Sequence, residues 1–153
     1  SCNKTCHRPV LPDLFLLLHC YLYDIVKKQL REAVMASVKI EAVYTEDGES
    51  SIVFVAPVQN NQKLNSDSDA FGFGYIENRE KGEVTRYPFI LEEFDEKLAL
   101  LDWGSDSEKN KTTVDIIDRP LSTGTIITYN EIDEEGNHHG PYTYRIVGVT
   151  FFE

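Results

Sequence analysis

The segment at residues 131–141 has the highest density of chemically active side chains in the chain. It reads EIDEEGNHHGP and places four carboxylates and two imidazoles, His138 and His139, within nine residues. Imidazole binds zinc, copper or nickel, and carboxylates add oxygen donors. One hypothesis is therefore a metal-dependent hydrolase that uses His138 and His139. Adjacent histidines on an extended chain point to opposite sides, however, and a polar loop that joins strands near Tyr129 and Tyr142 is the simpler interpretation.

No other pattern in the chain indicates catalysis. The sequence contains no G-x-G-x-x-G, no G-K-[ST] phosphate loop and no G-x-S-x-G elbow. Cys2, Cys6 and His7 resemble part of a zinc site, but a structural zinc site needs four ligands, and only Cys20 or His19 could complete this one. The sequence therefore favours a function that is not enzymatic, with no cofactor.

The charge of the chain is strongly negative. The net charge is −11; residues 1–34 hold five basic and three acidic groups, which leaves ten basic and 23 acidic groups for residues 35–153. Contacts from Lys and Arg to phosphates supply most nucleic-acid affinity, so we expect no nucleic-acid partner. The charge serves a basic protein partner, a metal ion or solubility alone. Our main hypothesis is a non-enzymatic acidic binding module, such as an inhibitor or immunity-like protein that engages a basic partner.

Two acidic segments and one aromatic residue are the candidates for such an interface. Trp103 is the only tryptophan, and tryptophan supplies large contact area at interfaces. The proposed binding residues are Trp103, Asp102, Asp106, Glu108, Asp133, Glu134 and Glu135. A third hypothesis is a carbohydrate-binding or structural β module that uses Tyr75, Tyr87 and Trp103.

The chain changes character at Met35, its only methionine. Before it, apolar residues recur at steps of three and four and predict one amphipathic helix over residues 11–34. This segment is a packed element, a surface-lying anchor or an upstream extension, and it is the only part that we expect to meet a membrane. All three cysteines precede residue 21. Their absence from residues 35–153, the predicted acidic all-β domain, favours the cytoplasm over a secreted disulfide scaffold.

From Ser37 onward, apolar and polar residues alternate with the period of a β-strand. Asp47-Gly48 predicts a two-residue hairpin turn, and the apolar return strand at residues 51–56 predicts a central position in its sheet. Further strands are predicted at about 70–77, 83–90, 97–103, 112–117, 124–130 and 142–152. About eight antiparallel strands predict a mainly β fold, either a sandwich or a barrel.

Three local patterns add detail to this expectation. The stretch FGFGY at residues 71–75 places three aromatic residues on one strand face and two glycines on the other, so something must lie close over the glycines, either a neighbouring aromatic side chain or a ligand such as a sugar. Pro88 predicts an edge or a bulge, because proline cannot donate to a sheet ladder. The polar run from Gln59 to Asp69 predicts a long surface loop.

Overall fold

The computed structural model describes residues 15–27, 36–59, 62–104 and 111–152. The chain divides into two compact units, residues 1–33 and 34–153. The first contains a helix at residues 15–27, which confirms this part of the predicted helix; residues 11–14 and 28–34 lie outside the described ranges, as does Met35. The large apolar side chains of the helix are exposed. No described helix has the length and apolar character needed to cross a membrane.

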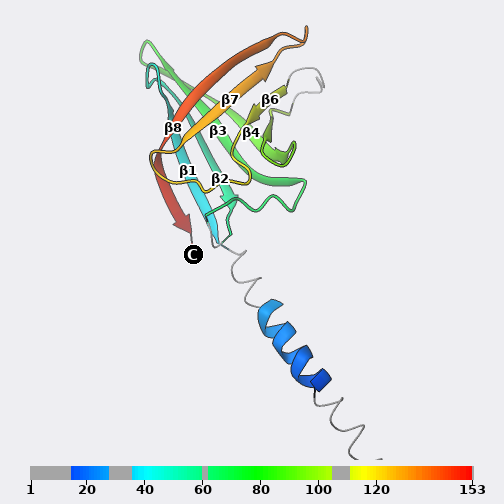
Figure 1. Cartoon of the computed structure of the whole chain (residues 1–153). Coiled ribbons are helices and arrows are strands. Elements are labelled where there is room, and N and C mark those ends of the chain that lie inside the picture. The colour runs from blue at the N-terminus through cyan, green and yellow to red at the C-terminus, as the bar shows by residue number, and fades with distance from the viewer. Residues whose placement is uncertain (1–14, 28–35, 60–61, 105–110, 153) are drawn as a thin grey trace, which may run out of the picture. The chain divides into compact units, whose positions relative to one another are not determined.

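The second unit is a closed barrel of eight antiparallel strands in sequence order, in which β8 returns to pair with β1 (Figure 1). The predicted β fold is confirmed, and of the two architectures the barrel is the one observed. The strands are β1 (Ser37–Tyr44), β2 (Ser50–Pro57), β3 (Ala70–Glu80), β4 (Glu83–Glu93), β5 (Ala99–Asp102), β6 (Lys111–Val114), β7 (Ile126–Ile132) and β8 (His138–Phe152).

Alternation of side chains along the strands fills the barrel with aliphatic residues. Val38, Ile40 and Ala42 of β1 point inward and are buried, while the residues between them are partly exposed. Strand β2 pairs on both sides, with β1 and β3, which confirms its predicted central position. Burial of this face supplies the main stabilisation, about 1.5–3 kcal/mol for each large side chain.

The two ends of the barrel differ. We call the end with the β1–β2, β3–β4 and β7–β8 turns the upper end and the other the lower end (Figure 1). Loop residues close the lower end: Leu64 is buried and bridges to Val58, and Ile116 and Leu121 are also buried. The predicted long loop at 59–69 is confirmed in its described residues, but it does not lie wholly on the surface, since Leu64 completes the core and Asn65 is also buried. Strand β6 likewise ends at Val114, and Ile116 belongs to this lower plug.

Gly72 and Gly74 allow β2 and β3 to approach closely. A Cβ atom on Gly74 would lie 2.1 Å from the Val53 carbonyl oxygen and 2.7 Å from Cα of Phe54, so the covering group is the neighbouring strand itself. A bulge between Ala70 and Gly72 turns Phe71 inward. Phe71 is 6% exposed and Phe73 is 63% exposed, so the prediction that they share one face is wrong.

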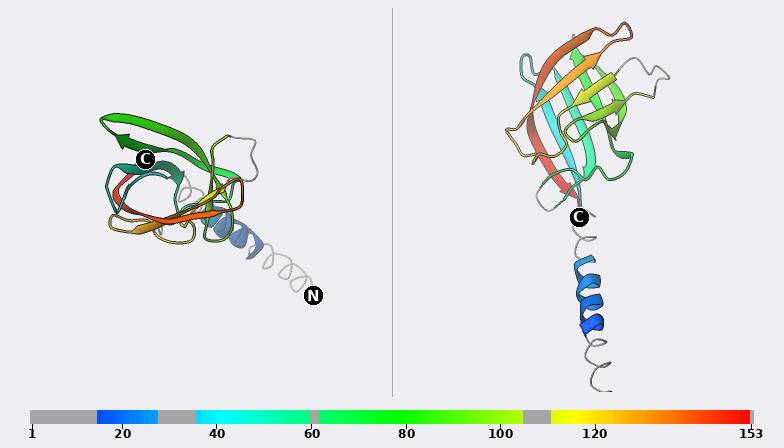
Figure 2. Two further views of the ribbon diagram at one scale, coloured as in Figure 1. Left: turned by 90° about the horizontal axis from the view of Figure 1, so that it is seen from above. Right: turned by 45° about the vertical axis from the view of Figure 1, so that its right-hand side comes forward.

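The upper turns differ from the simplest expectation. The β1–β2 connection spans residues 45–49, so the predicted two-residue turn at Asp47-Gly48 is wrong, although Gly48 does adopt a positive φ of 69°. Asp47 accepts a hydrogen bond from the Glu49 backbone N–H, which stabilises the longer loop. A true two-residue turn joins β3 to β4 at Lys81-Gly82, where φ is 51° and 80°. Seen from above, this hairpin reaches past the ring of the other strands (Figure 2).

Candidate ligand-binding site

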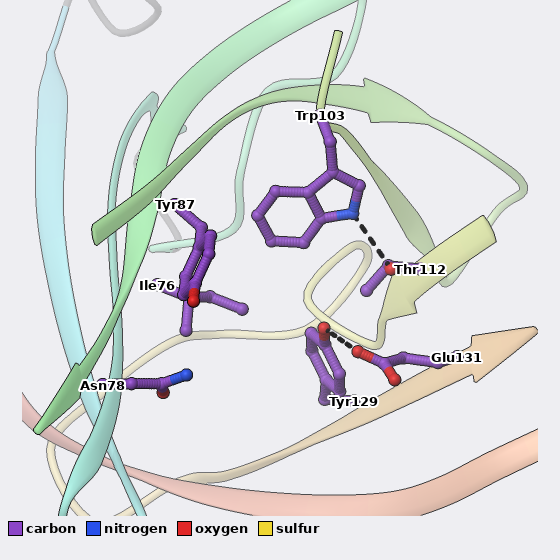
Figure 3. A pocket seen from close by; sticks show the side chains of 7 residues that line it. All are labelled: Ile76, Asn78, Tyr87, Trp103, Thr112, Tyr129 and Glu131. Carbon is purple, nitrogen blue, oxygen red and sulfur yellow. Dashed lines mark hydrogen bonds between the residues drawn. The ribbon is translucent and has the colours of Figure 1, made fainter. Parts of the chain in front are cut away.

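A cavity of about 330 Å³ lies toward the upper end of the barrel. Five strands or strand ends supply its walls, and the side chains point into a common space (Figure 3). We call it the mouth cavity, and its lining is Ile76 and Asn78 of β3, Tyr87 of β4, Trp103 after β5, Thr112 of β6, and Tyr129 and Glu131 of β7.

Strand geometry explains why these residues meet. Tyr129 and Glu131 are two residues apart on β7 and therefore share the inner face of the strand. Register then aligns the neighbours, since Thr112 lies opposite Glu131 and Tyr87 lies opposite Ile76. The floor is buried, with Thr112 2% and Tyr129 6% exposed, whereas Tyr87 at the rim is 49% exposed.

An interruption of the barrel wall separates the two sides of the cavity. Strand β4 pairs with β3 along most of its length, but it pairs with β5 only from Ile90 to Glu93. Residues 83–89 of β4 have no partner strand on the β5 side among the described residues. Pro88 lies in this half, so the predicted edge position is confirmed locally. Tyr87 faces Trp103 and Thr112 across the interruption, and this leaves the cavity accessible.

Two interactions hold Trp103 in place. Its indole Nε1–H donates a hydrogen bond of 3.1 Å to Thr112 Oγ1. Its ring packs against Phe89 with a centroid distance of 5.5 Å and an interplanar angle of 78°, the favourable edge-to-face arrangement. The indole is therefore oriented by its neighbours and presents an ordered aromatic surface to the cavity (Figure 3).

Tyr129 and Glu131 form the polar corner of the cavity. The Tyr129 hydroxyl donates a hydrogen bond to Glu131 Oε1. Burial, followed by this bond and the charge of Glu131, raises the pKa of Tyr129 far above its ordinary value of 10. The phenol is thus a neutral donor at any physiological pH. The Glu131 carboxylate can accept further hydrogen bonds besides the one from Tyr129.

A group of four tyrosines lies at the same end of the barrel interior. Neighbouring rings have centroid distances between 5.4 and 6.2 Å, and the members are Tyr44, Tyr129, Tyr142 and Tyr144. Burial raises the pKa of Tyr144. Its hydroxyl lies 3.3 Å from Ser50 Oγ, which in turn donates to Asn78 Oδ1 at 2.7 Å. This chain of contacts links the tyrosine group to the cavity wall.

The histidine segment is built differently from its prediction. Strand β7 continues to Ile132 and strand β8 begins at His138, so the predicted loop is reduced to a turn at residues 133–137. His139 Nε2 lies 2.8 Å from Asp133 Oδ2, and Asp133 Oδ1 accepts the Asn137 backbone N–H at 2.8 Å. These bonds, His139 first, lower the pKa of Asp133 to about 2. Among the described residues no three His, Cys, Asp or Glu side chains gather to hold a metal ion.

The predicted acidic interface residues have local structural contacts where the structure describes them. Asp102 Oδ1 accepts the Gly104 backbone N–H at 2.8 Å, and Asp133 organises its own turn. Glu134 and Glu135 are exposed in that turn, while Asp106 and Glu108 lie outside the described residues. Of the five proposed binding residues that the structure describes, Trp103 alone lines the mouth cavity.

The carbohydrate hypothesis named two residues of the cavity, Tyr87 and Trp103, whereas Tyr75 points outward beneath the Arg86 guanidinium, 5.2 Å from its ring centre. Sequence reasoning missed Asn78, Thr112 and Tyr129 as site residues and treated Glu131 only as part of a metal segment. A signal was available: the inward-facing series of β7 runs from Ile127 through Tyr129 to Glu131, which places a carboxylate on the core-facing side of a strand.

The lining supports binding by stacking, hydrogen bonding and charge. It presents three aromatic side chains, of which two are tyrosines, together with one carboxylate, one amide, one threonine hydroxyl and one aliphatic group. No imidazole, thiol or amine lines it among the described residues. Nucleophilic catalysis needs an activated nucleophile beside a base; the nearest arrangement in this lining is Tyr129 beside Glu131, and the raised pKa of Tyr129 keeps its hydroxyl in the weakly nucleophilic neutral form. Comparisons with protein families, curated proteins and solved structures found no match to the chain.

Proposed function

We propose that this protein is a non-enzymatic binding protein that holds one compact small molecule in the mouth cavity. The observation that carries the proposal is the convergence of Tyr87, Trp103 and Tyr129 with Glu131 around a space of about 330 Å³. Small-molecule sites span about 300–1,000 Å³ and combine apolar and aromatic walls with a few placed polar groups. The cavity has this composition and lies at the lower limit of size, which favours a compact ligand.

The barrel architecture supports the same function. An eight-stranded barrel has an interior wide enough either for its own side chains or for one small ligand. Here aliphatic side chains and the lower loops fill the lower part. Toward the upper end the inward positions carry tyrosine and polar residues, and the wall is interrupted beside β4.

The two earlier hypotheses have less support. A hydrolase centred on His138 and His139 would need a ligand group that the described residues do not provide. A basic protein partner stays a prediction, because Asp102 and Asp133 are engaged in turns of the chain itself. The mouth cavity, by contrast, brings residues from five strands together in one place.

The test is to map small-molecule fragments on the isotopically labelled full chain by NMR. We expect saturable shifts of backbone amides at Asn78, Thr112 and Glu131 and of the Trp103 indole N–H. Another hollow, at the lower end of the barrel and lined in part by Leu64 and Ile117, serves as an internal control. Saturable shifts only at that hollow, or none at the mouth cavity, would contradict the proposal.

A matched pair of variants separates the cavity from the surface. Ile76→Trp directs a larger side chain into the mouth cavity and should abolish fragment binding there. Ile90→Trp makes the same change on the outer face of β4, where Ile90 is exposed, and should leave binding intact. Equal binding by both variants would contradict the assignment, provided that thermal unfolding shows both to be folded.

A further inference from the structure

In the part of the chain that the structure describes, no cation balances the carboxylate of the mouth cavity. Glu131 is partly buried and accepts a hydrogen bond from Tyr129, but it forms no ion pair among the described residues. Lys111 is close in register but lies on the other face of β6, and its Nζ sits 5.9 Å from the centre of the Phe94 ring. A charge in a partly dehydrated cavity is costly unless a counter-charge meets it.

The aromatic walls favour the same sign of ligand. The faces of Trp, Tyr and Phe attract cations through the quadrupole of the ring, and tryptophan does so most strongly. Trp103, Tyr87 and Tyr129 lie around the cavity, with Glu131 at one side (Figure 3). Rings and a carboxylate together would contact both the apolar surface and the charge of an organic cation.

The surroundings of the cavity are acidic as well. A second hollow of about 380 Å³ shares Asn78 and Tyr87 with the mouth cavity and is lined further by Glu80, Glu83 and Lys81. Glu80 and Glu83 lie directly opposite each other at the end of the β3–β4 hairpin. Like charges so placed destabilise a hairpin, but they raise the local concentration of cations near the cavity.

We infer that the ligand of the mouth cavity is a compact organic ammonium ion, bound with its charge beside Glu131 and its carbon skeleton against Trp103 and the two tyrosines. This inference rests on the proposed binding function and adds the ligand class. An anion would meet Glu131, and none of the described lining residues is basic, so nothing in that lining would offset the repulsion. A neutral ligand would leave the carboxylate without a counter-charge.

The test compares ligands of equal shape and different charge. One pair is choline and its neutral carbon isostere 3,3-dimethylbutan-1-ol. The other pair is 2-phenylethylammonium and the neutral 2-phenylethanol. The ammonium ion of the second pair carries N–H protons that can donate hydrogen bonds, where choline carries methyl groups. Trp103 is the only tryptophan, so its fluorescence reports binding to the full chain. We expect the cation of at least one pair to bind at least about tenfold more tightly than its neutral partner.

Two charge-neutralising variants locate the effect. Glu131→Gln keeps an acceptor for the Tyr129 hydroxyl and should remove the preference for the cation, with little change for the neutral compound. Glu134→Gln removes the same charge from an exposed position in the β7–β8 turn and should keep the preference. A melting curve of each variant checks that both remain folded.

The outcomes are distinct from those of the fragment experiment. If neutral compounds bind as tightly as cations, or if no member of either pair binds, the ammonium inference is overturned while fragment mapping decides the binding function separately. If both variants reduce the preference equally, the general field of the protein and not Glu131 selects the charge, and the inference fails in that form.

Discussion

Replacing Thr112 by valine should weaken the barrel and loosen Trp103. Valine has nearly the same shape as threonine and suits a β-strand, so the change removes a hydroxyl without opening a large space. The Thr112 hydroxyl accepts the indole N–H of Trp103 at 3.1 Å, and the residue is 2% exposed. The variant therefore removes the acceptor that positions the main aromatic wall of the mouth cavity, together with the hydrogen bond between the Thr112 hydroxyl and Tyr129.

The size of the effect follows from the burial of both partners. A neutral hydrogen bond contributes about 0.5–1.5 kcal/mol, and a buried donor left without an acceptor costs about 1–3 kcal/mol. Trp103 is only partly buried, so water can reach part of the indole, and we expect a loss of about 1 kcal/mol. With a urea dependence of about 1–3 kcal/mol/M for small proteins, the unfolding midpoint should fall by about 0.5 M.

The assay is urea unfolding followed by the fluorescence of Trp103, together with its emission maximum in the folded state. Thr113→Val is the matched control, because Thr113 is the next residue, points to the opposite face of β6 and makes no side-chain hydrogen bond among the described residues. We expect the emission of folded Thr112→Val to change and that of Thr113→Val to stay the same. Equal midpoints and equal spectra for both variants would refute the role assigned to Thr112.

Two further predictions concern the fold and the β7–β8 turn. Gly74→Ala should destabilise the barrel by about 1–3 kcal/mol or more, because its Cβ would meet backbone atoms that cannot rotate away. The Cβ of Gly148→Ala would meet mainly the flexible Glu41 carboxylate, so this variant should lose less stability. Equal melting temperatures for the two variants would contradict this difference. Asp133 has its pKa lowered from 3.8 to about 2, so its contribution to stability is present above about pH 4 and is lost as the pH falls toward 2. Asp133→Asn should flatten thermal stability across that window, and an unchanged pH profile would show that the bond to His139 stabilises nothing.

Much of the fold follows from local sequence patterns. Alternation such as Val38, Ile40 and Ala42 fixes both the strand and its buried face, since one face must enter the core. The positions of bulges and the lengths of loops could not be predicted from these local patterns, because they depend on how the strands pair when the barrel closes. Phe71 turned inward only because of a register shift against β4, and no feature of its own sequence sets that shift. Leu64 is buried because the lower end needs a plug, which a polar loop composition conceals.

The candidate site was harder to predict than the fold, for a physical reason. Its members are spread over residues 76–131, and each belongs to a different strand or strand end except for two pairs that share β3 and β7. Their convergence depends on the register of every ladder between β3 and β7 and on the short pairing of β4 with β5. Density in the sequence pointed instead to residues 131–141, where neighbours in the chain satisfy one another within a turn.

The interior itself explains why a site forms at one end. On β7, which lines the cavity, and on its neighbour β8, inward positions change from aliphatic to polar or aromatic toward the upper end. On β7 the series is Ile127, Tyr129, Glu131, and on β8, read toward the same end, it is Ile146, Tyr144, Tyr142. A protein selected for stability alone would continue the aliphatic series, because a carboxylate and phenols at inward positions bury less apolar surface and need partners. The polar inward residues therefore agree with the proposed ligand site, and Glu131, which has no cation beside it in the described chain, agrees with the proposed ammonium ligand.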